Sequence, residues 1–257
     1  PKIIGRQFGT RSKFMLDDVG SWYYKGAYGI QLLPNNDHLT KEVACQLNSK
    51  VLDFYFKHIG PVKAGGYYEY RAQYLEKLPC FTDDKVGKFD IMVDKVDYIT
   101  HILDIESKIT RFPEAYLGEY DGNLSYIDYE WQTRRYPVNA DIQELADGRF
   151  AVTAGRSDEI TNPLIDQGNR EERKLRAQYV HTAVDDRNMK SGEEQSIPIP
   201  RSREGVEQLL DSLEEDKTRV RETNIEELEA QIDEIVYELF DLTQEEREVI
   251  EDYLEVF

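Results

Sequence analysis

Cysteine is nearly absent from this sequence, which has two in 257 residues, Cys45 and Cys80. They do not form a Cys-x-x-Cys pair, so a dense disulfide framework is excluded and we expect reduced packing residues in a cytoplasmic protein. Long apolar runs are missing too. No segment approaches the roughly 20 residues of a membrane helix and no signal peptide is visible in the sequence, so we expect no membrane partner.

Motifs that bind nucleotides or metals are also lacking. There is no Gly-x-Gly-x-x-Gly and no P-loop, and the four histidines are scattered without ligand spacing, so we expect no metal site. Glu106 and Lys108 form a Glu-x-Lys that nucleases use with an upstream Asp, here Asp104, to hold Mg²⁺. Because this segment lies in a predicted helix, and such sites need strands to bring the ligands together, we favour helix-surface residues.

Positive charge is scarce overall, since 32 Lys and Arg face 51 Asp and Glu, a formal net charge of −19. Taken as one sum, this argues against a nucleic-acid partner. Residues 1–80, however, hold 11 basic and 7 acidic residues (11 − 7 = +4), and residues 81–257 hold 21 and 44 (21 − 44 = −23). Residues 204–257 alone hold 4 and 20 (4 − 20 = −16). A basic module is therefore joined to an acidic tail.

The length of 257 residues is enough for one large domain or two ordinary ones, and a hydrophobic content of 40% indicates that the chain folds. The sequence begins at Pro1 rather than Met, so we expect a piece of a longer protein. Residues 11–33 predict strands, and Asp37 is expected to cap a helix that runs to about His58. Further on, the pattern predicts a turn at 65–66, a short helix across 71–77 and a strand start at 78–81.

The second half predicts a long helix at 83–110 with an apolar seam at Phe89, Met92, Val96, Ile99 and Leu103. A core-facing helix is favoured over a free coiled coil because the seam is short. Residues 120–160 predict strands, residues 161–203 a long loop with an extended piece at 197–201, and the remainder two or three helices. Capping boxes are expected at Asn224 with Glu227 and at Thr243 with Glu246, and a second apolar seam lies at 225–239.

Residues 57–81, KHIGPVKAGGYYEYRAQYLEKLPCF, gather four tyrosines and four Lys or Arg around a Gly-Gly pair. In a structural interpretation they form a half-buried hairpin whose tyrosines pack inward while the cationic chains reach water. In a functional interpretation they form a phosphate-contacting loop, because glycine lets a backbone come close to a ligand. Composition alone favours neither.

Two segments resemble a known family. Residues 47–81 carry Leu47-Asn48-Ser49, Gly65-Gly66-Tyr67-Tyr68 and Tyr74-Leu75-Glu76-Lys77-Leu78-Pro79, and residues 232–257 carry IDEIVYELFDLTQEEREVIEDYLEVF. These segments resemble the C-terminal target-recognition (TaqI-like specificity) domain of type IIG restriction–modification enzymes and related DNA adenine methyltransferases. Phe240 replaces a tyrosine of that pattern. The acidic middle is similar to the inserted region of haloarchaeal members.

The resemblance implies a division of labour. This part would hold double-stranded DNA and present an adenine for flipping. A methyltransferase domain of the same parent chain would bind S-adenosylmethionine and methylate adenine N6, and a nuclease domain would require Mg²⁺ where the parent cleaves DNA. The fragment itself would be neither an enzyme nor a cofactor binder. Together with the positive charge of this part of the chain, the DNA role that the resemblance implies makes the candidate DNA contacts Lys13, Lys25, Lys63, Tyr67, Arg71 and Lys77.

The expected fold class is α+β, with a mixed small sheet, packed helices, a strand-rich insert and a C-terminal helical segment. We expect a target-recognition α/β core at 1–82, a connecting helix at 83–119, an insert at 120–203 and acidic helices at 204–257. Two other functions stay open: a protein-interaction module that docks a partner through the two apolar seams, and a stand-alone nuclease. The acidic surface also suits a protein from salty cytoplasm.

Overall fold

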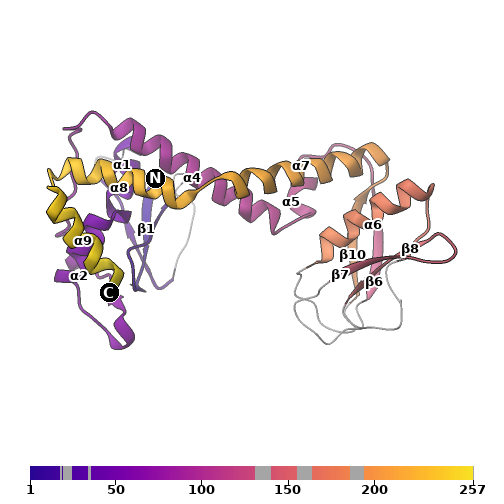
Figure 1. Ribbon diagram of the computed structural model, residues 1–257, viewed down its shortest axis with the longest axis horizontal. Coiled ribbons are helices and arrows are strands. Elements are labelled where there is room, and N and C mark those ends of the chain that lie inside the picture. The colour runs from indigo at the N-terminus through magenta and orange to yellow at the C-terminus, as the bar shows by residue number, and fades with distance from the viewer. Residues whose placement is uncertain are drawn as a thin grey trace. The chain divides into compact units, whose positions relative to one another are not determined.

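The structure, a computed structural model, describes residues 1–17, 19, 25–33, 36–130, 140–154, 164–185 and 194–256 (Figure 1). The chain divides into two compact units. Unit 1 is Pro1–His101 with Asn224–Phe257, and unit 2 is Ile102–Thr223. Nine α-helices and ten strands are seen in the described residues. The α+β class is confirmed, but the strands pair as four small antiparallel sheets rather than one mixed sheet.

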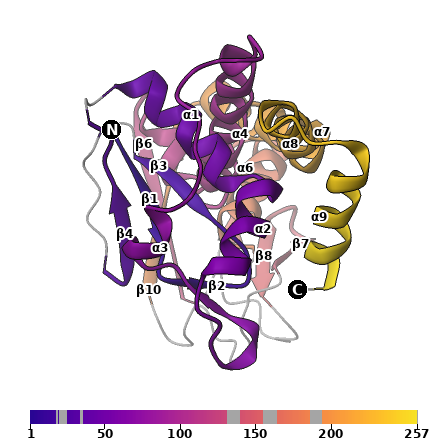
Figure 2. The same cartoon turned by 90° about the vertical axis from the view of Figure 1, so that its left-hand side faces the viewer.

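Unit 1 is built on a three-stranded sheet in the order β3-β1-β4, seen in Figure 2. Central β1 sends Ile3 into the core, and Gly5 of the same strand lies so close to the ring of Phe14 that a Cβ would come within 2.5 Å of it. A two-stranded sheet, β2-β5, lies in the same unit. The strands are β1 (Lys2–Arg6), β2 (Phe8–Gly9), β3 (Phe14–Asp17), β4 (Ala27–Ile30) and β5 (Tyr68–Glu69).

Two helices, α1 (Asp37–Asn48) and α2 (Lys50–Ile59), replace the single helix expected to run to His58. The break is at Ser49, whose backbone is extended and whose hydroxyl accepts the N–H of Leu52 at 3.3 Å, so Ser49 caps α2. The expected Asp37 cap is also wrong by one position. Asn36 caps α1, because its side chain accepts the N–H of Leu39 at 3.2 Å.

After α2 the chain turns through η1 (Ala64–Gly66), passes β5 and forms the short helix α3 (Ala72–Leu75), as expected for 71–77. The prediction that a strand starts at 78–81 is wrong. The backbone of Phe81 bonds the side chain of Gln46 instead, with both its N–H and its carbonyl at 2.8 Å. Because these two groups already have partners, Phe81 has no need of a neighbouring strand.

Helix α4 (Phe89–Ile109) is the predicted long helix, starting six residues later than expected, and the boundary between the units falls inside it. In unit 1 its seam residues Phe89 and Met92 are buried against α8 (Ile225–Leu239) and α9 (Gln244–Val256). The seam of α8 is buried in the same cluster at Ile232, Ile235 and Leu239. These residues therefore fill a core, whereas Leu103 of the α4 seam is 48% exposed.

Unit 2 packs two small sheets against α6 (Arg170–Val184) and α7 (Arg203–Glu222), around a core that includes Val152, Tyr179 and Ile199. The prediction of a long loop at 161–203 is therefore wrong for the residues that form α6. The predicted extended piece at 197–201 lies largely in β10. The other elements are α5 (Glu114–Leu117), β6 (Leu124–Glu130), β7 (Ala140–Glu144), β8 (Phe150–Ala154), β9 (Leu164–Ile165) and β10 (Glu194–Pro200).

Both cysteines are free, and burial raises the pKa of the Cys45 thiol to about 12 and that of Cys80 to about 11, so they are protonated at neutral pH. Among the described residues, no helix combines the length and the apolar character needed to cross a membrane. The domain boundaries expected from the sequence stay a prediction. In the structure, residues 224–257 pack in the same unit as residues 1–101.

Candidate nucleic-acid interface

One end of the three-stranded sheet gathers exposed basic residues. The antiparallel register places Gly5 opposite Phe14 and Arg6 opposite Ala27, so β1 ends where β3 and β4 begin. The residues that enter and leave the strands at this end therefore come together although they are far apart in the sequence. Four of them are cationic and exposed: Arg6, Arg11, Lys13 and Lys25.

Backbone hydrogen bonds join a second segment to this end of the sheet. The N–H of Gln7 donates to the carbonyl of Gly26 at 3.3 Å, and the carbonyl of Gln7 accepts the N–H of Tyr70 at 2.9 Å. The adjacent pairing of β2 with β5 continues the connection. Residues 68–71 thus lie beside the sheet end, and Lys63 and Arg71 join the same surface. We call the six cations the basic rim: Arg6, Arg11, Lys13, Lys25, Lys63 and Arg71.

The Gly-Gly loop (residues 61–68) presents part of this rim. The two sides of the loop are joined by a hydrogen bond in which the N–H of Lys63 donates to the carbonyl of Tyr67 at 2.6 Å. Gly65 and Gly66 have φ values of 78° and 76°, a left-handed conformation that favours glycine, which explains the pair. Tyr67 is 49% exposed, whereas Tyr68 is buried. The buried Tyr68 agrees with the structural interpretation of this stretch, and the exposed Tyr67 leaves the functional interpretation a prediction.

Glu69 holds two of the rim cations. Its Oε2 lies 2.9 Å from Nζ of Lys63 and 2.8 Å from Nη2 of Arg71. The close contact with Arg71 and then that with Lys63 lower the pKa of this carboxyl to about 2. The two cationic side chains remain nearly half exposed while the carboxylate is covered. The three side chains together carry a single net positive charge.

Three other exposed or half-exposed lysines of unit 1 are paired with nearby carboxylates. Lys41 pairs with Asp97, Lys50 with Glu251 and Lys88 with Glu238, at 2.6, 3.0 and 2.6 Å. By contrast, Arg6, Arg11, Lys13 and Lys25 make no ion pair with any residue that the structure describes. Four unpaired cations of residues 1–80 therefore lie at the rim, whereas Lys77, which also makes no ion pair with a described residue, lies apart from it.

Asn48 of the Leu47-Asn48-Ser49 motif fixes the backbone beside the rim residue Lys13. The side chain of Asn48 accepts the N–H of Phe14 at 2.8 Å and donates to its carbonyl at 2.9 Å. Asp53 accepts both the N–H and the hydroxyl of Ser12 at 2.8 Å, and the buried Lys57 lies 3.3 Å from Asp53. The backbone on either side of Lys13 is therefore fixed to α1 and α2, which leaves the Lys13 side chain free to face solvent.

The structure brings together five of the six residues predicted as DNA contacts and leaves one apart. Lys13, Lys25, Lys63, Tyr67 and Arg71 lie at the rim. Lys77 is exposed in the turn after α3, with its Nζ 5.6 Å from the centre of the Tyr74 ring, and no contact ties it to the rim. Sequence reasoning missed Arg6 and Arg11. Arg11 could have been found from its position two residues before the predicted contact Lys13, but no neighbouring residue indicated Arg6.

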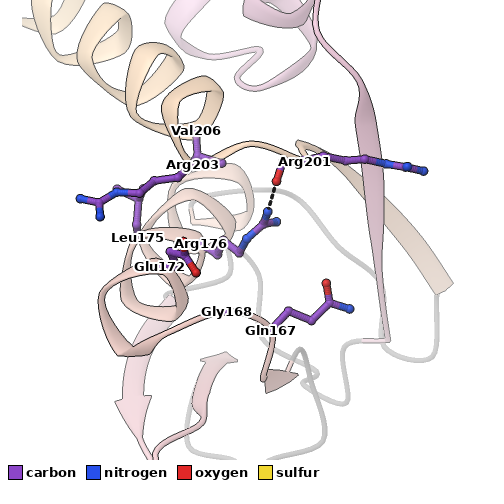
Figure 3. Close-up of a pocket in the computed structure, with 8 residues that line it drawn as sticks. All are labelled: Gln167, Gly168, Glu172, Leu175, Arg176, Arg201, Arg203 and Val206. Atoms are coloured by element: carbon purple, nitrogen blue, oxygen red, sulfur yellow. Dashed lines mark hydrogen bonds between the residues drawn. The ribbon is translucent and has the colours of Figure 1, made fainter.

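Unit 2 contains a cavity of about 240 Å³ near the start of α7 (Figure 3). Its arginines do not converge. The guanidinium of Arg176 donates to the carbonyl of Arg201 at 2.6 Å, while the side chains of Arg201 and Arg203 extend in opposite directions in Figure 3. Arg201 donates to the carbonyl of Leu124 and Arg203 to Glu207. Because each guanidinium already has a partner, the cavity is a poor anion site.

The alternative nuclease residues lie on one helix. Glu106 and Lys108 are both in α4, and Nζ of Lys108 lies 3.4 Å from Glu119 and 4.4 Å from the centre of the Tyr116 ring. The described residues contain no group of three or more His, Cys, Asp or Glu side chains that could hold a metal ion. The helix-surface interpretation of this segment accounts for both side chains.

Comparison with known proteins gives one family match, over part of the chain. Residues 1–80 match the family model of the TaqI-like C-terminal specificity domain. The match supports the resemblance for this part of the chain, which contains the sheet, α1, α2, the Gly-Gly loop and the whole basic rim. Unit 2 and the C-terminal helices lie outside it. No curated protein and no solved structure matches the chain.

Proposed function

We propose that this chain is the DNA sequence-recognition module of a restriction–modification enzyme. The observation that carries the proposal is the basic rim, which lies wholly within the residues that match a specificity domain. Phosphate contacts from lysine and arginine set the register of a protein on duplex DNA, while other side chains read the base edges. The rim supplies the first kind of contact, and the exposed Tyr67 lies beside it.

In this proposal the chain catalyses no reaction. It positions duplex DNA for adenine-N6 methylation, and for cleavage where the parent enzyme cleaves, by domains that the given sequence does not include. S-adenosylmethionine belongs to that methyltransferase domain, and Mg²⁺ to a nuclease domain. The sequence itself has no glycine-rich cofactor loop and no Asn-Pro-Pro-aromatic motif, so we assign no residue here to either group.

The rim can be tested with a charge-matched pair of triple variants of the full chain. The first replaces Arg11, Lys13 and Lys25 with glutamine. The control replaces three cations that the structure pairs with carboxylates, Lys41, Lys50 and Lys88. Binding of a fluorescent duplex of random sequence is measured by anisotropy from about 50 to 300 mM salt, and melting curves verify folding.

Each lost phosphate contact flattens the plot of log affinity against log salt by about 0.9 units. We expect the rim variant to lose up to about 2.7 units of slope and the control to lose little, although both change net charge equally. Equal slopes for the two variants would show that only net charge matters. Absence of duplex binding by the unaltered chain at about 50 mM salt would refute the proposal and favour an interaction module.

A further inference from the structure

Side chains along the extended segment that follows the glycine pair point alternately to two sides, so the segment has a distinct outer face. Tyr67, Glu69 and Arg71 are alternate residues, so they point to one side, while Tyr68 and Tyr70 point into the core. Phe8 lies directly opposite Glu69 in the β2–β5 pair, which places it on the same side, and it is 47% exposed. Lys63 reaches this face through its ion pair with Glu69.

Glu69 therefore occupies the middle of a face made of two exposed aromatic rings and two cations. Its side chain is 7% exposed because Lys63 and Arg71 cover it, and both cations meet the same oxygen, Oε2. With its pKa near 2, the carboxyl stays ionised throughout the neutral range. A carboxylate placed at the centre of a DNA-facing basic surface opposes phosphate binding, so its presence calls for a role.

We infer that Glu69 is a specificity-determining positioning residue of the DNA interface, an inference that rests on the proposed function. It cancels one of two adjacent cations and fixes both head groups beside Phe8 and Tyr67. Sequence-independent affinity arises from phosphate neutralisation, and specificity is the ratio of specific to non-specific binding. By limiting the loop to one net charge, Glu69 lowers the non-specific affinity and thereby raises this ratio.

Direct reading of a base by Glu69 is a different role, and the geometry disfavours it. A glutamate reads cytosine by accepting its exocyclic amino group in the major groove. Here the carboxylate is covered and Oε2 is shared by two cations. Those cations are the groups that face solvent, so they, rather than Glu69, are positioned to touch DNA.

Glu69→Gln in the full chain tests the inference, because it keeps the shape of the side chain and removes its charge. Glu76→Gln is the matched control, since Glu76 is exposed on the same unit and makes no ion pair with any described residue. Site selection from a randomised duplex library first yields the preferred sequence. Affinities for this duplex and for a scrambled duplex are then measured across a salt series, alongside melting curves.

For Glu69→Gln we expect a salt slope on scrambled duplex that is steeper by about 0.9 units and an affinity about eightfold higher at about 0.1 M salt. The ratio of specific to scrambled affinity should fall, and Glu76→Gln should change neither quantity. The double variant Lys63→Gln/Glu69→Gln restores the local net charge of +1, so its slope should return to that of the unaltered chain.

A purely structural role predicts another pattern, in which Glu69→Gln melts at a lower temperature while slope and ratio stay unchanged; that pattern overturns the inference. A falling ratio that the control variant shares also overturns it, because net charge would then be the cause. If the unaltered chain binds no duplex, the proposed function fails first. If it binds through the rim while Glu69→Gln has no effect on slope or ratio, this inference alone fails.

Discussion

Replacing Asp233 with asparagine is expected to stabilise the chain at neutral pH. Asp233 lies on α8 and accepts the backbone N–H of Lys50, at the start of α2, at 2.8 Å. Its side chain is buried, with 8% of the residue exposed. Burial is the main cause that raises its pKa from 3.8 to about 6, against the opposing influence of Lys50. At about 1.4 kcal/mol for each tenfold change in proton affinity, this rise in pKa corresponds to about 3 kcal/mol.

The sign follows from which state holds the proton. Between about pH 4 and pH 6 the native state keeps a proton that the unfolded chain has lost. The contribution of Asp233 to the free energy of unfolding therefore falls as pH rises through this window, and the full cost applies above about pH 6. Asparagine does not ionise, yet its side-chain oxygen can still accept the N–H of Lys50.

Urea unfolding at intervals from pH 4 to pH 7.5 measures this difference. Relative to the unaltered chain, we expect Asp233→Asn to gain up to about 3 kcal/mol at pH 7.5 and little at pH 4. Asp252→Asn, the same chemical change at an exposed position of α9, should show no such pH-dependent gain. A variant that is less stable at pH 7.5, or a gain that does not vary with pH, would refute the reasoning.

Two further predictions concern the support of the rim and the acidic surface. Asn48→Ala should lower the free energy of unfolding in urea by about 2–4 kcal/mol, because it leaves the backbone N–H and carbonyl of Phe14 without their partners. Asn36→Ala, which removes one helix cap, should lower it by about 1 kcal/mol. Equal losses would contradict the role given to the two hydrogen bonds between Asn48 and Phe14. Melting temperature should rise from about 0.1 to 1 M salt, because screening weakens repulsion among the 44 acidic residues that follow residue 80; a flat or falling series would argue against a halophilic design.

Helix α6 shows why part of the fold escaped sequence reasoning. Its start carries a complete capping box, in which Asn169 and Glu172 bond each other's backbone N–H groups at 2.9 and 3.0 Å. The signal was thus present, but the helix is mostly polar and buries small residues such as Ala177 and Ala183. Because these buried residues are small, the helical periodicity of large apolar side chains is weak in this segment. In α8, where Ile232, Ile235 and Leu239 mark the buried face, the same reasoning succeeded.

The candidate site was predictable only where it is local. The Gly-Gly pair and the charges around it can be read from one stretch of sequence, and the structure places that stretch at the rim. Arg6 joins it because the register of β1 with β4 and the hydrogen bonds of Gln7 bring three distant segments together. The Glu69 ion pairs likewise depend on the turn geometry of the loop. Such contacts arise from tertiary structure and leave no periodic trace.

In the proposed function, the distribution of ion pairs would give the acidic C-terminal helices a part in DNA recognition. Glu251 of α9 and Glu238 of α8 neutralise Lys50 and Lys88, which would otherwise attract DNA phosphates to other parts of unit 1. The excess carboxylates of these helices repel the duplex from their own surface. Because the basic rim keeps most of its charge unpaired, a duplex would be attracted chiefly to this end of the sheet, although Lys77 is an exposed cation away from it. A net negative charge and a DNA-binding module are therefore compatible, and the acid restricts where the duplex can dock.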